Sequence, residues 1–176
     1  MTFRKATMRD LNRIAEIYSE IHDAEEAGRA VIGWVRAIYP TRATAETAIR
    51  EGIMYVEEAD GHIVAAAKID QTQVSEYADA AWTQDAPDER VLVLHALVVS
   101  PAEAGKGYGS AFVRFYEETA RERGCPYLRM DTNERNATAR ALYRRLGYAE
   151  IGIVSCVFNG IPDVRLVCLE KTLSEA

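Results

Sequence analysis

Hydrophobic positions near the start of the chain recur at helical spacing and are preceded by one short strand. We expect that strand over residues 2–6. After Asp10, the expected N-cap, apolar residues follow a helical period as far as Ile21. The same pattern predicts two more helices, over residues 28–39 and 44–51. The chain therefore begins with one strand and three helices.

Strand patterns dominate the middle of the chain. Residues 53–58 and 62–70 flank an Asp60-Gly61 turn, which is typical of a β-hairpin. Residues 71–88 show no clean period and carry several carboxylates, so we expect a loop or a short helix there. Residues 90–99 are apolar on both faces, as in a central strand.

The remainder of the chain alternates helices with strands. Helices are predicted over residues 107–123 and from an Asn136 cap to Gly147. The predicted strands cover residues 126–132, 148–158 and 164–171. A strand–helix–strand unit of this kind requires a right-handed crossover and a parallel pairing. The pattern therefore predicts one α/β domain over residues 1–176, of mixed α+β type with a mixed sheet.

The composition of the chain limits the kinds of binding partner and the cell compartment that we expect. The 176 residues are 48% hydrophobic and 27% charged, with a net charge of −6. This balance argues against a general binder of nucleic acid or anionic membranes and favours cationic partners such as amines. Cys125, Cys156 and Cys168 form no CxxC pair, so we expect buried thiols, no disulfide and no metal site. Because no signal region or long apolar stretch is present, we expect a cytoplasmic protein.

A glycine-rich loop between the central strand and the next helix is the first candidate site. Its sequence is Ala104-Gly105-Lys106-Gly107-Tyr108-Gly109-Ser110. Uncovered backbone N–H groups and the helix start would form a cradle for a phosphate or diphosphate, to which Lys106 could add a charge. The loop does not match the Walker motif GxxxxGK[ST], because Ser100 stands at the position of its first glycine. It does not match the dinucleotide-binding motif GxGxxG either, because Ser110 stands at the position of its last glycine. A purely structural tight turn remains the alternative.

Two motifs together resemble the GNAT superfamily of N-acyltransferases. The first is Val99-Ser100-Pro101 followed by the glycine loop, which is similar to the family's acetyl-coenzyme A loop. The second is Leu128–Thr132 followed by Asn136-x-x-Ala139-x-x-Leu142-Tyr143-x-x-Leu146-Gly147-Tyr148. They cover roughly residues 90–150 in the family's order. Ala104 stands where the family has Gln or Arg, so one side-chain contact to the cofactor is missing.

The resemblance implies a GNAT-like three-layer fold, with helices flanking a central mixed sheet that is splayed between the strands ending at Val99 and Thr132. Acetyl-CoA would lie in that gap. The cofactor-binding residues that the resemblance implies are Leu97, Val98 and Val99 along the pantetheine arm, Gly105, Lys106, Gly107, Tyr108, Gly109 and Ser110 at the pyrophosphate, and Asn136 on the arm. Tyr143 would approach the thioester sulfur and act as the acid.

Acyl transfer to an amine needs a base for the nucleophile and an acid for the leaving thiolate. His95 is the natural base because histidine titrates near neutrality, with Asp70 and Asp131 as other candidates. His95 shares a strand face with Leu97 and Val99 provided that no bulge intervenes. The alternatives are a buried histidine satisfied by one hydrogen bond and, for Tyr143 in its helix's apolar stripe, core packing.

These observations predict an acetyl-CoA-dependent N-acetyltransferase that acts on a primary amine of a small molecule or peptide by direct attack. The alternative is a non-catalytic acyl-CoA binding or sensing domain. Trp34 and Tyr39 could line an acceptor pocket, and the acidic stretch of residues 76–89 could attract a cationic acceptor. Because dimers are common in the resembled family, we also expect that a homodimer is possible.

Overall fold

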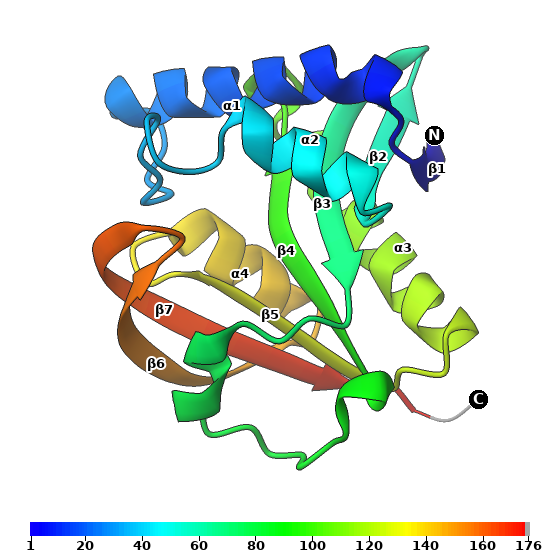
Figure 1. Cartoon of the computed structure of the whole chain (residues 1–176), viewed down its shortest axis with the longest axis vertical. Coiled ribbons are helices and arrows are strands. Elements are labelled where there is room, and N and C mark those ends of the chain that lie inside the picture. Colours follow the sequence, from blue (N-terminus) through cyan, green and yellow to red (C-terminus); the bar gives the residue numbers. More distant parts are fainter. Residues whose placement is uncertain (175–176) are drawn as a thin grey trace.

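A computed structural model describes residues 1–174 as helices covering both faces of one seven-stranded sheet (Figure 1). The strand order is β1-β2-β3-β4-β5-β7-β6. The strands are β1 (Thr2–Lys5), β2 (Met54–Ala59), β3 (His62–Asp70), β4 (Val91–Val99), β5 (Tyr127–Asn133), β6 (Ala149–Phe158) and β7 (Ile161–Thr172). The helices are α1 (Leu11–Glu26), α2 (Arg42–Arg50), α3 (Tyr108–Glu122) and α4 (Ala137–Arg145). The predicted three-layer mixed fold is therefore confirmed.

Each helical layer buries the apolar stripe that its sequence predicts. Ile14 and Ile17 of α1 pack with Ala45 of α2 on one face of β2 and β3. Phe112 and Tyr116 of α3 are fully buried on the opposite face. The two stripes are separated by the sheet, as Figure 1 shows for α1 and α3.

The sheet opens between β4 and β5. These strands pair in parallel from Val91↔Tyr127 to Leu94↔Met130, and the ladder then stops. β4 continues to Val99, still paired with β3, and β5 continues to Asn133, still paired with β7. Figure 1 shows the two strands meeting at one end and diverging at the other. The predicted splay is confirmed, and it leaves one edge of β4 uncovered.

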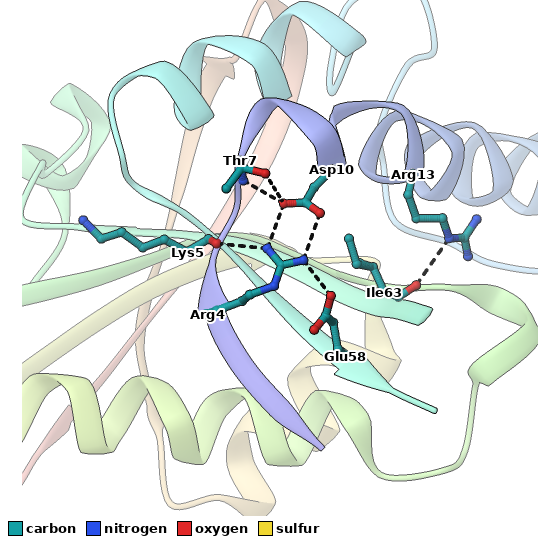
Figure 2. A network of polar contacts seen from close by, with 7 residues as sticks. All are labelled: Arg4, Lys5, Thr7, Asp10, Arg13, Glu58 and Ile63. Atoms are coloured by element: carbon teal, nitrogen blue, oxygen red, sulfur yellow. Dashed lines mark hydrogen bonds and ion pairs between the residues drawn. The ribbon is translucent and has the colours of Figure 1, made fainter. Parts of the chain in front are cut away.

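A polar network fixes the N-terminal strand against α1 (Figure 2). The Arg4 guanidinium donates to both oxygens of Asp10, at 2.8 and 2.9 Å, and to Glu58 at 2.6 Å. These hydrogen bonds lower the pKa of the Asp10 carboxyl to about 2. Asp10 directly precedes α1 as predicted, but its carboxylate accepts from the N–H and hydroxyl of Thr7 instead of capping that helix. The network thus orients α1 on the edge of the sheet.

The helix predicted over residues 28–39 is wrong. This segment is a loop with one isolated bridge between Val35 and Tyr39. Gly33 adopts a φ of +88°, and a Cβ there would lie 2.4 Å from the side-chain nitrogen of Asn133. Glu25 accepts hydrogen bonds from the backbone N–H groups of residues 32 and 33, at 2.5 and 3.0 Å. The chain therefore folds back beneath α1, which brings Trp34 and Tyr39 toward the open part of the sheet.

The other predicted elements are found within a few residues of their expected ends. The β2–β3 hairpin turns at Asp60-Gly61, both with positive φ, as the primed hairpin turns require. Residues 71–90 form a long connection with two short 3₁₀ turns, Ser75–Asp79 and Asp88–Arg90. We call this connection the strap, because it crosses the face of the sheet beside β5 and β7.

Candidate active site

A cavity of about 900 Å³ passes through the split between β4 and β5. One part of its lining comes from the end of β4, the glycine loop and α4, and includes Val99, Gly109, Asn136 and Tyr143. The other part lies under the 28–40 loop and the strap. We call it the acceptor chamber and define it by Trp34, Tyr39, Lys68, Asp70, His95 and Asp131.

The glycine loop is an open turn at the start of α3. Gly105 and Gly107 have φ values of +80° and +89°, and no atom lies near where their Cβ atoms would be. Gly109 is closer to the core, because a Cβ there would meet Leu142 at 3.3 Å. The first turn of α3 therefore presents backbone N–H groups without covering side chains.

Lys106 does not offer a free charge to this cradle. Its ammonium donates to Glu103 at 2.8 Å, and the side chain is more than half exposed. Tyr108 packs against the core cluster beneath α3, and Ser110 lies in the first turn of that helix. The side chains of Lys106 and Tyr108 thus make contacts within the protein.

The end of β4 exposes the edge that faces β5. Leu97, Val98 and Val99 line the cavity, and the described part of the chain has no strand paired to that edge beyond Leu94. An unpaired edge offers main-chain donors and acceptors to an extended ligand. The three residues that the resemblance singled out thus lie on the open side of the strand.

A β-bulge in β4 separates His95 from these residues. Ala96 has a φ of +51°, and the β3–β4 register skips one residue between Lys68↔His95 and Ala66↔Val98. His95 therefore faces the acceptor chamber, whereas Leu97 packs toward α3. The expected shared face of His95 with Leu97 and Val99 is wrong, because the extra residue inverts the alternation.

His95 is buried and bonded to an acidic partner. Its Nε2 lies 3.2 Å from Oδ1 of Asp70, and its side chain is 10% exposed. Burial by itself would raise the pKa of Asp70, but the hydrogen bond and charge of His95 outweigh it, and the pKa is lowered. Thr72 donates its N–H to the same carboxylate at 2.8 Å. The result is a histidine–carboxylate pair that opens onto the cavity.

Two residues of α4 complete the lining near the split. Asn136 caps the helix by accepting from the N–H of Ala139 at 3.1 Å, so its amide NH₂ is left for other partners. The side chain of Tyr143 is almost wholly buried, and burial, with Asp131 adding to it, raises the pKa of its phenol. Its hydroxyl makes no hydrogen bond to any residue between 1 and 174. Tyr143 is therefore a protonated phenol that faces the cavity.

Comparison with known proteins places the chain in a family. Residues 11–148 match the family model described as the acetyltransferase (GNAT) family. The chain belongs to the GNAT acetyltransferase family. A streptothricin acetyltransferase of Streptomyces lavendulae is 35% identical over 81 residues, which cover 46% of this chain and 40% of that relative. The aligned region is thus less than half of either protein.

Solved structures show the same fold over the whole chain. A GNAT-family acetyltransferase from Streptococcus agalactiae has a TM-score of 0.84 at 24% identity, covering 99% of this chain and 96% of that one. A Salmonella typhimurium protein solved with its cofactor acetyl-CoA has a TM-score of 0.67 at 22% identity, covering 100% and 95%. At these identities the likeness is one of fold.

The GNAT family uses acetyl-CoA, and the cavity of this GNAT protein fits that group. The open loop at Gly105 and Gly107 leaves room for a diphosphate at the start of α3. The uncovered edge at residues 97–99 can pair with an amide-bearing arm, and the cavity continues from there to Tyr143. Ala104 also lines the cavity, so the position where the family has Gln or Arg lies at this site.

Sequence reasoning missed Lys68 of the acceptor chamber and Tyr77, which contacts Asp131 from the strap. Lys68 lines the chamber from β3, with its ammonium 5.8 Å from the centre of the Tyr39 ring. Tyr77, on the strap, donates its hydroxyl to Oδ2 of Asp131 at 2.7 Å. The sequence could have pointed to Lys68, because a lysine interrupts a largely apolar strand there, but it could not have pointed to Tyr77, which lies in a segment without periodicity.

Within residues 1–174 no cluster of His, Cys, Asp or Glu could hold a metal ion, and no helix could cross a membrane.

Side chains of β5 and β7 hold the strap in place. The Arg129 guanidinium lies 4.3 Å from the centre of the Trp82 ring and donates to the carbonyl of Gln84 at 2.7 Å. The N–H of Thr83 donates to Glu170 at 3.2 Å. These contacts fix the segment that holds the Tyr77 hydroxyl against Asp131, so the strap helps to position a residue of the site.

Proposed function

We propose that this GNAT protein is an acetyl-CoA-dependent N-acetyltransferase that acts on a primary amine. The observation that carries the proposal is the arrangement of the split sheet. An open phosphate cradle and an uncovered strand edge lead into a chamber that holds a histidine–carboxylate pair. When bound, acetyl-CoA supplies an acetyl thioester that an amine can cleave with release of free thiol.

The proposed cofactor contacts follow the lining of the cavity. Leu97, Val98 and Val99 would pair with the pantetheine arm through their main chain, and Asn136 would donate its free amide NH₂ to it. The pyrophosphate would lie on the backbone of Gly105, Lys106, Gly107, Tyr108, Gly109 and Ser110. Because Lys106 is paired with Glu103, we assign the binding there to backbone donors.

His95 is the proposed base. An alkyl ammonium with a pKa of about 10.4 must lose a proton before its nitrogen can attack. His95 lines the chamber, and Asp70, whose Oδ1 lies 3.2 Å from Nε2 of His95, orients its ring. His95 takes the proton from the amine, and direct attack follows without an acylated side chain.

Tyr143 is the proposed acid. It holds a proton at its phenol oxygen, because burial opposes ionisation. Its hydroxyl faces the cavity between the cofactor arm and the acceptor chamber. Tyr143 donates this proton to the departing sulfur, which leaves as a neutral thiol.

We propose that the acceptor is a small molecule or peptide that carries a primary amine. The streptothricin acetyltransferase relative supports a small-molecule acceptor, and Trp34 and Tyr39 provide an aromatic wall for one. Residues 1–176 are proposed to act as one domain in the cytoplasm, where unpaired Cys125 and Cys168 would stay reduced. A homodimer is a further proposal, based on the family alone.

Thiol release from acetyl-CoA in the presence of an amine panel tests the function. We expect amine-dependent release by the purified protein. His95→Gln should lower kcat by about 10²-fold or more while the KM for acetyl-CoA stays within about twofold. His62→Gln, an exposed histidine on β3, is the matched control and should behave as the wild type.

Two results would contradict these assignments. A wild-type kcat in His95→Gln would remove His95 as the base. Acetyl-CoA that binds, with no thiol released by any amine, would favour the alternative of a non-catalytic acyl-CoA binding domain.

A further inference from the structure

Asp131 is a carboxylate of the acceptor chamber that forms no ion pair with any residue between 1 and 174. It follows Met130, the last residue of β5 that pairs with β4, and therefore lies directly at the split. Oδ2 accepts from the Tyr77 hydroxyl, whereas Oδ1 accepts no hydrogen bond from any residue of the described chain. Its partner on β7, Cys168, is a buried thiol whose pKa is raised by burial to about 12, so it stays neutral.

The surroundings of Asp131 make this charge costly. Burial raises the pKa of its carboxyl, and the Tyr77 hydrogen bond and the nearby His95 and Lys68 only partly oppose the rise. Neither His95 nor Lys68 forms an ion pair with it among residues 1–174. An ammonium placed at Oδ1 would remove this cost, because a desolvated carboxylate is stabilised strongly by a bonded cation.

Other features of the chamber also favour a cation. Asp70 and Glu51 line the same cavity, and Trp34 and Tyr39 form an edge-to-face pair with ring centres 6.0 Å apart. Aromatic faces attract ammonium groups, as Lys68 already illustrates at the Tyr39 ring. With Asp131, three carboxylates and two aromatic rings thus line a cavity whose cationic side chains are Lys68 and Arg29.

The reacting nitrogen cannot supply the missing charge throughout the reaction. It must be neutral when it attacks, and it then becomes an uncharged amide. A positive charge that stays beside Asp131 from substrate binding until the product has formed must therefore come from a second charged group on the acceptor. We infer that the acceptor is a di- or polyamine, whose non-reacting ammonium binds Asp131 while the other nitrogen is acetylated. This inference rests on the proposed acetyl transfer.

Tyr77 is the positioning residue in this arrangement. Its hydroxyl holds Oδ2 of Asp131, which leaves Oδ1 without a hydrogen bond from the described chain, in a residue that lines the cavity. Because Tyr77 belongs to the strap, the contacts of Arg129 and Glu170 with that segment also help to set the site.

Matched acceptors test the inference. Diaminopropane, putrescine and cadaverine are each compared with the monoamine of the same length, by thiol release from acetyl-CoA. We expect kcat/KM of the wild type to favour the best diamine by about 10-fold or more, as a bond to a charged group provides. Asp131→Asn should bring that ratio to within about threefold by raising the diamine KM. Tyr77→Phe should reduce the ratio in the same way, to a smaller extent.

Asp85→Asn is the matched control. It makes the same charge change on an exposed part of the strap that does not line the cavity. It should keep the wild-type ratio of diamine to monoamine.

Several outcomes would overturn the inference. Equal use of diamine and monoamine by the wild type would do so, and so would an equal loss of kcat for both acceptors in Asp131→Asn. If no amine releases thiol, the proposed function fails, and calorimetry of cadaverine with the CoA-saturated protein then tests the site alone. A cadaverine Kd about 10-fold weaker in Asp131→Asn supports the site, and an unchanged Kd contradicts it.

Discussion

At the scale of single residues, the backbone at Ala96 sets which side chains meet in the cavity. An alanine with φ of +51° is strained by about 1–2 kcal/mol, so the surrounding pairing must hold it in place. The bulge turns His95 toward Asp70 and the acceptor chamber, and turns Leu97 toward α3. Because Ala96 is left-handed, β4 contributes His95 to the acceptor chamber and Leu97 to the other part of the cavity.

Tyr143 provides the prediction that belongs to this scale. Tyr143→Phe removes the proton proposed for the departing sulfur and leaves the ring in place. We expect kcat to fall by about 10²-fold, with the KM for acetyl-CoA changed by less than about twofold. Steady-state thiol release measures both constants.

Tyr148→Phe is the control for that substitution. Tyr148 is buried in the same core and donates to Glu117 at 3.1 Å, but it does not line the cavity. Its removal should lower stability and leave kcat unchanged. An equal kcat for wild type and Tyr143→Phe would remove Tyr143 as the acid.

At the scale of elements, α3 links packing to ligand binding. Phe112 and Tyr116 bury one face of the helix under the sheet, and the Tyr116 hydroxyl donates to the carbonyl of Leu92 at 2.6 Å. The helix is therefore fixed relative to β4, and its first turn is held beside Val99. The cradle is a consequence of how this helix packs.

Gly107→Glu tests the cradle. A side chain at a φ of +89° is strained, and its carboxylate would repel a diphosphate at the start of α3. We expect the Kd of CoA, measured by calorimetry, to weaken by about 100-fold or more. Gly124→Glu makes a similar change at φ of +68° beyond the other end of α3 and should leave the Kd unchanged. Wild-type affinity in Gly107→Glu would contradict the placement of the diphosphate.

At the scale of the whole molecule, the packing of β2 within the sheet places the side chain of Glu57 in the core. Glu57 on β2 is fully buried between Phe3 of β1 and Ala65 of β3. Neither of its carboxylate oxygens has a hydrogen-bond partner in the described chain. Burial raises its pKa from 4.5 to about 7, with the N-terminal charge opposing the rise. The folded protein therefore binds a proton more tightly than the unfolded chain does.

This pKa predicts a pH dependence of stability. Between pH 4.5 and about 7 the folded state holds more protons than the unfolded state, so the contribution of Glu57 to stability falls as pH rises through that window. Glu57→Met removes the titration. At about 1.36 kcal/mol per pKa unit, its free energy of unfolding should gain up to about 3 kcal/mol over the wild type on going from pH 4.5 to 8.

Urea unfolding of both proteins at the two pH values measures this gain. Glu58→Met, the exposed-side neighbour that is paired with Arg4, is a control in which no such gain is expected. A Glu57→Met advantage that is the same at pH 4.5 and pH 8 would show that Glu57 does not titrate in this range.

Local sequence patterns predicted most of the helices and strands and several residues at one end of the cavity. Helical periods and turn residues predicted α1 to α4 and the β2–β3 hairpin, since these depend on contacts between residues near in sequence. The glycine loop, Asn136 and Tyr143 form local motifs, so their places could be predicted. The 28–39 segment was mispredicted because two glycines with positive φ and hydrogen bonds to Glu25 hold it as a loop. In this loop Trp34 lines a tertiary cavity, whereas Val35 and Ile38 are exposed.

The arrangement of residues in the acceptor chamber depends on the tertiary structure. Asp70 and His95 are 25 residues apart, and Tyr77 and Asp131 are 54 apart. Their meeting depends on strand register, on one bulge and on how the strap crosses the sheet. A bulge inverts side-chain alternation without leaving a clear mark in residue type, and the register follows from packing of the whole sheet. Local patterns therefore identify the residues, but only the folded sheet brings these charges to one chamber.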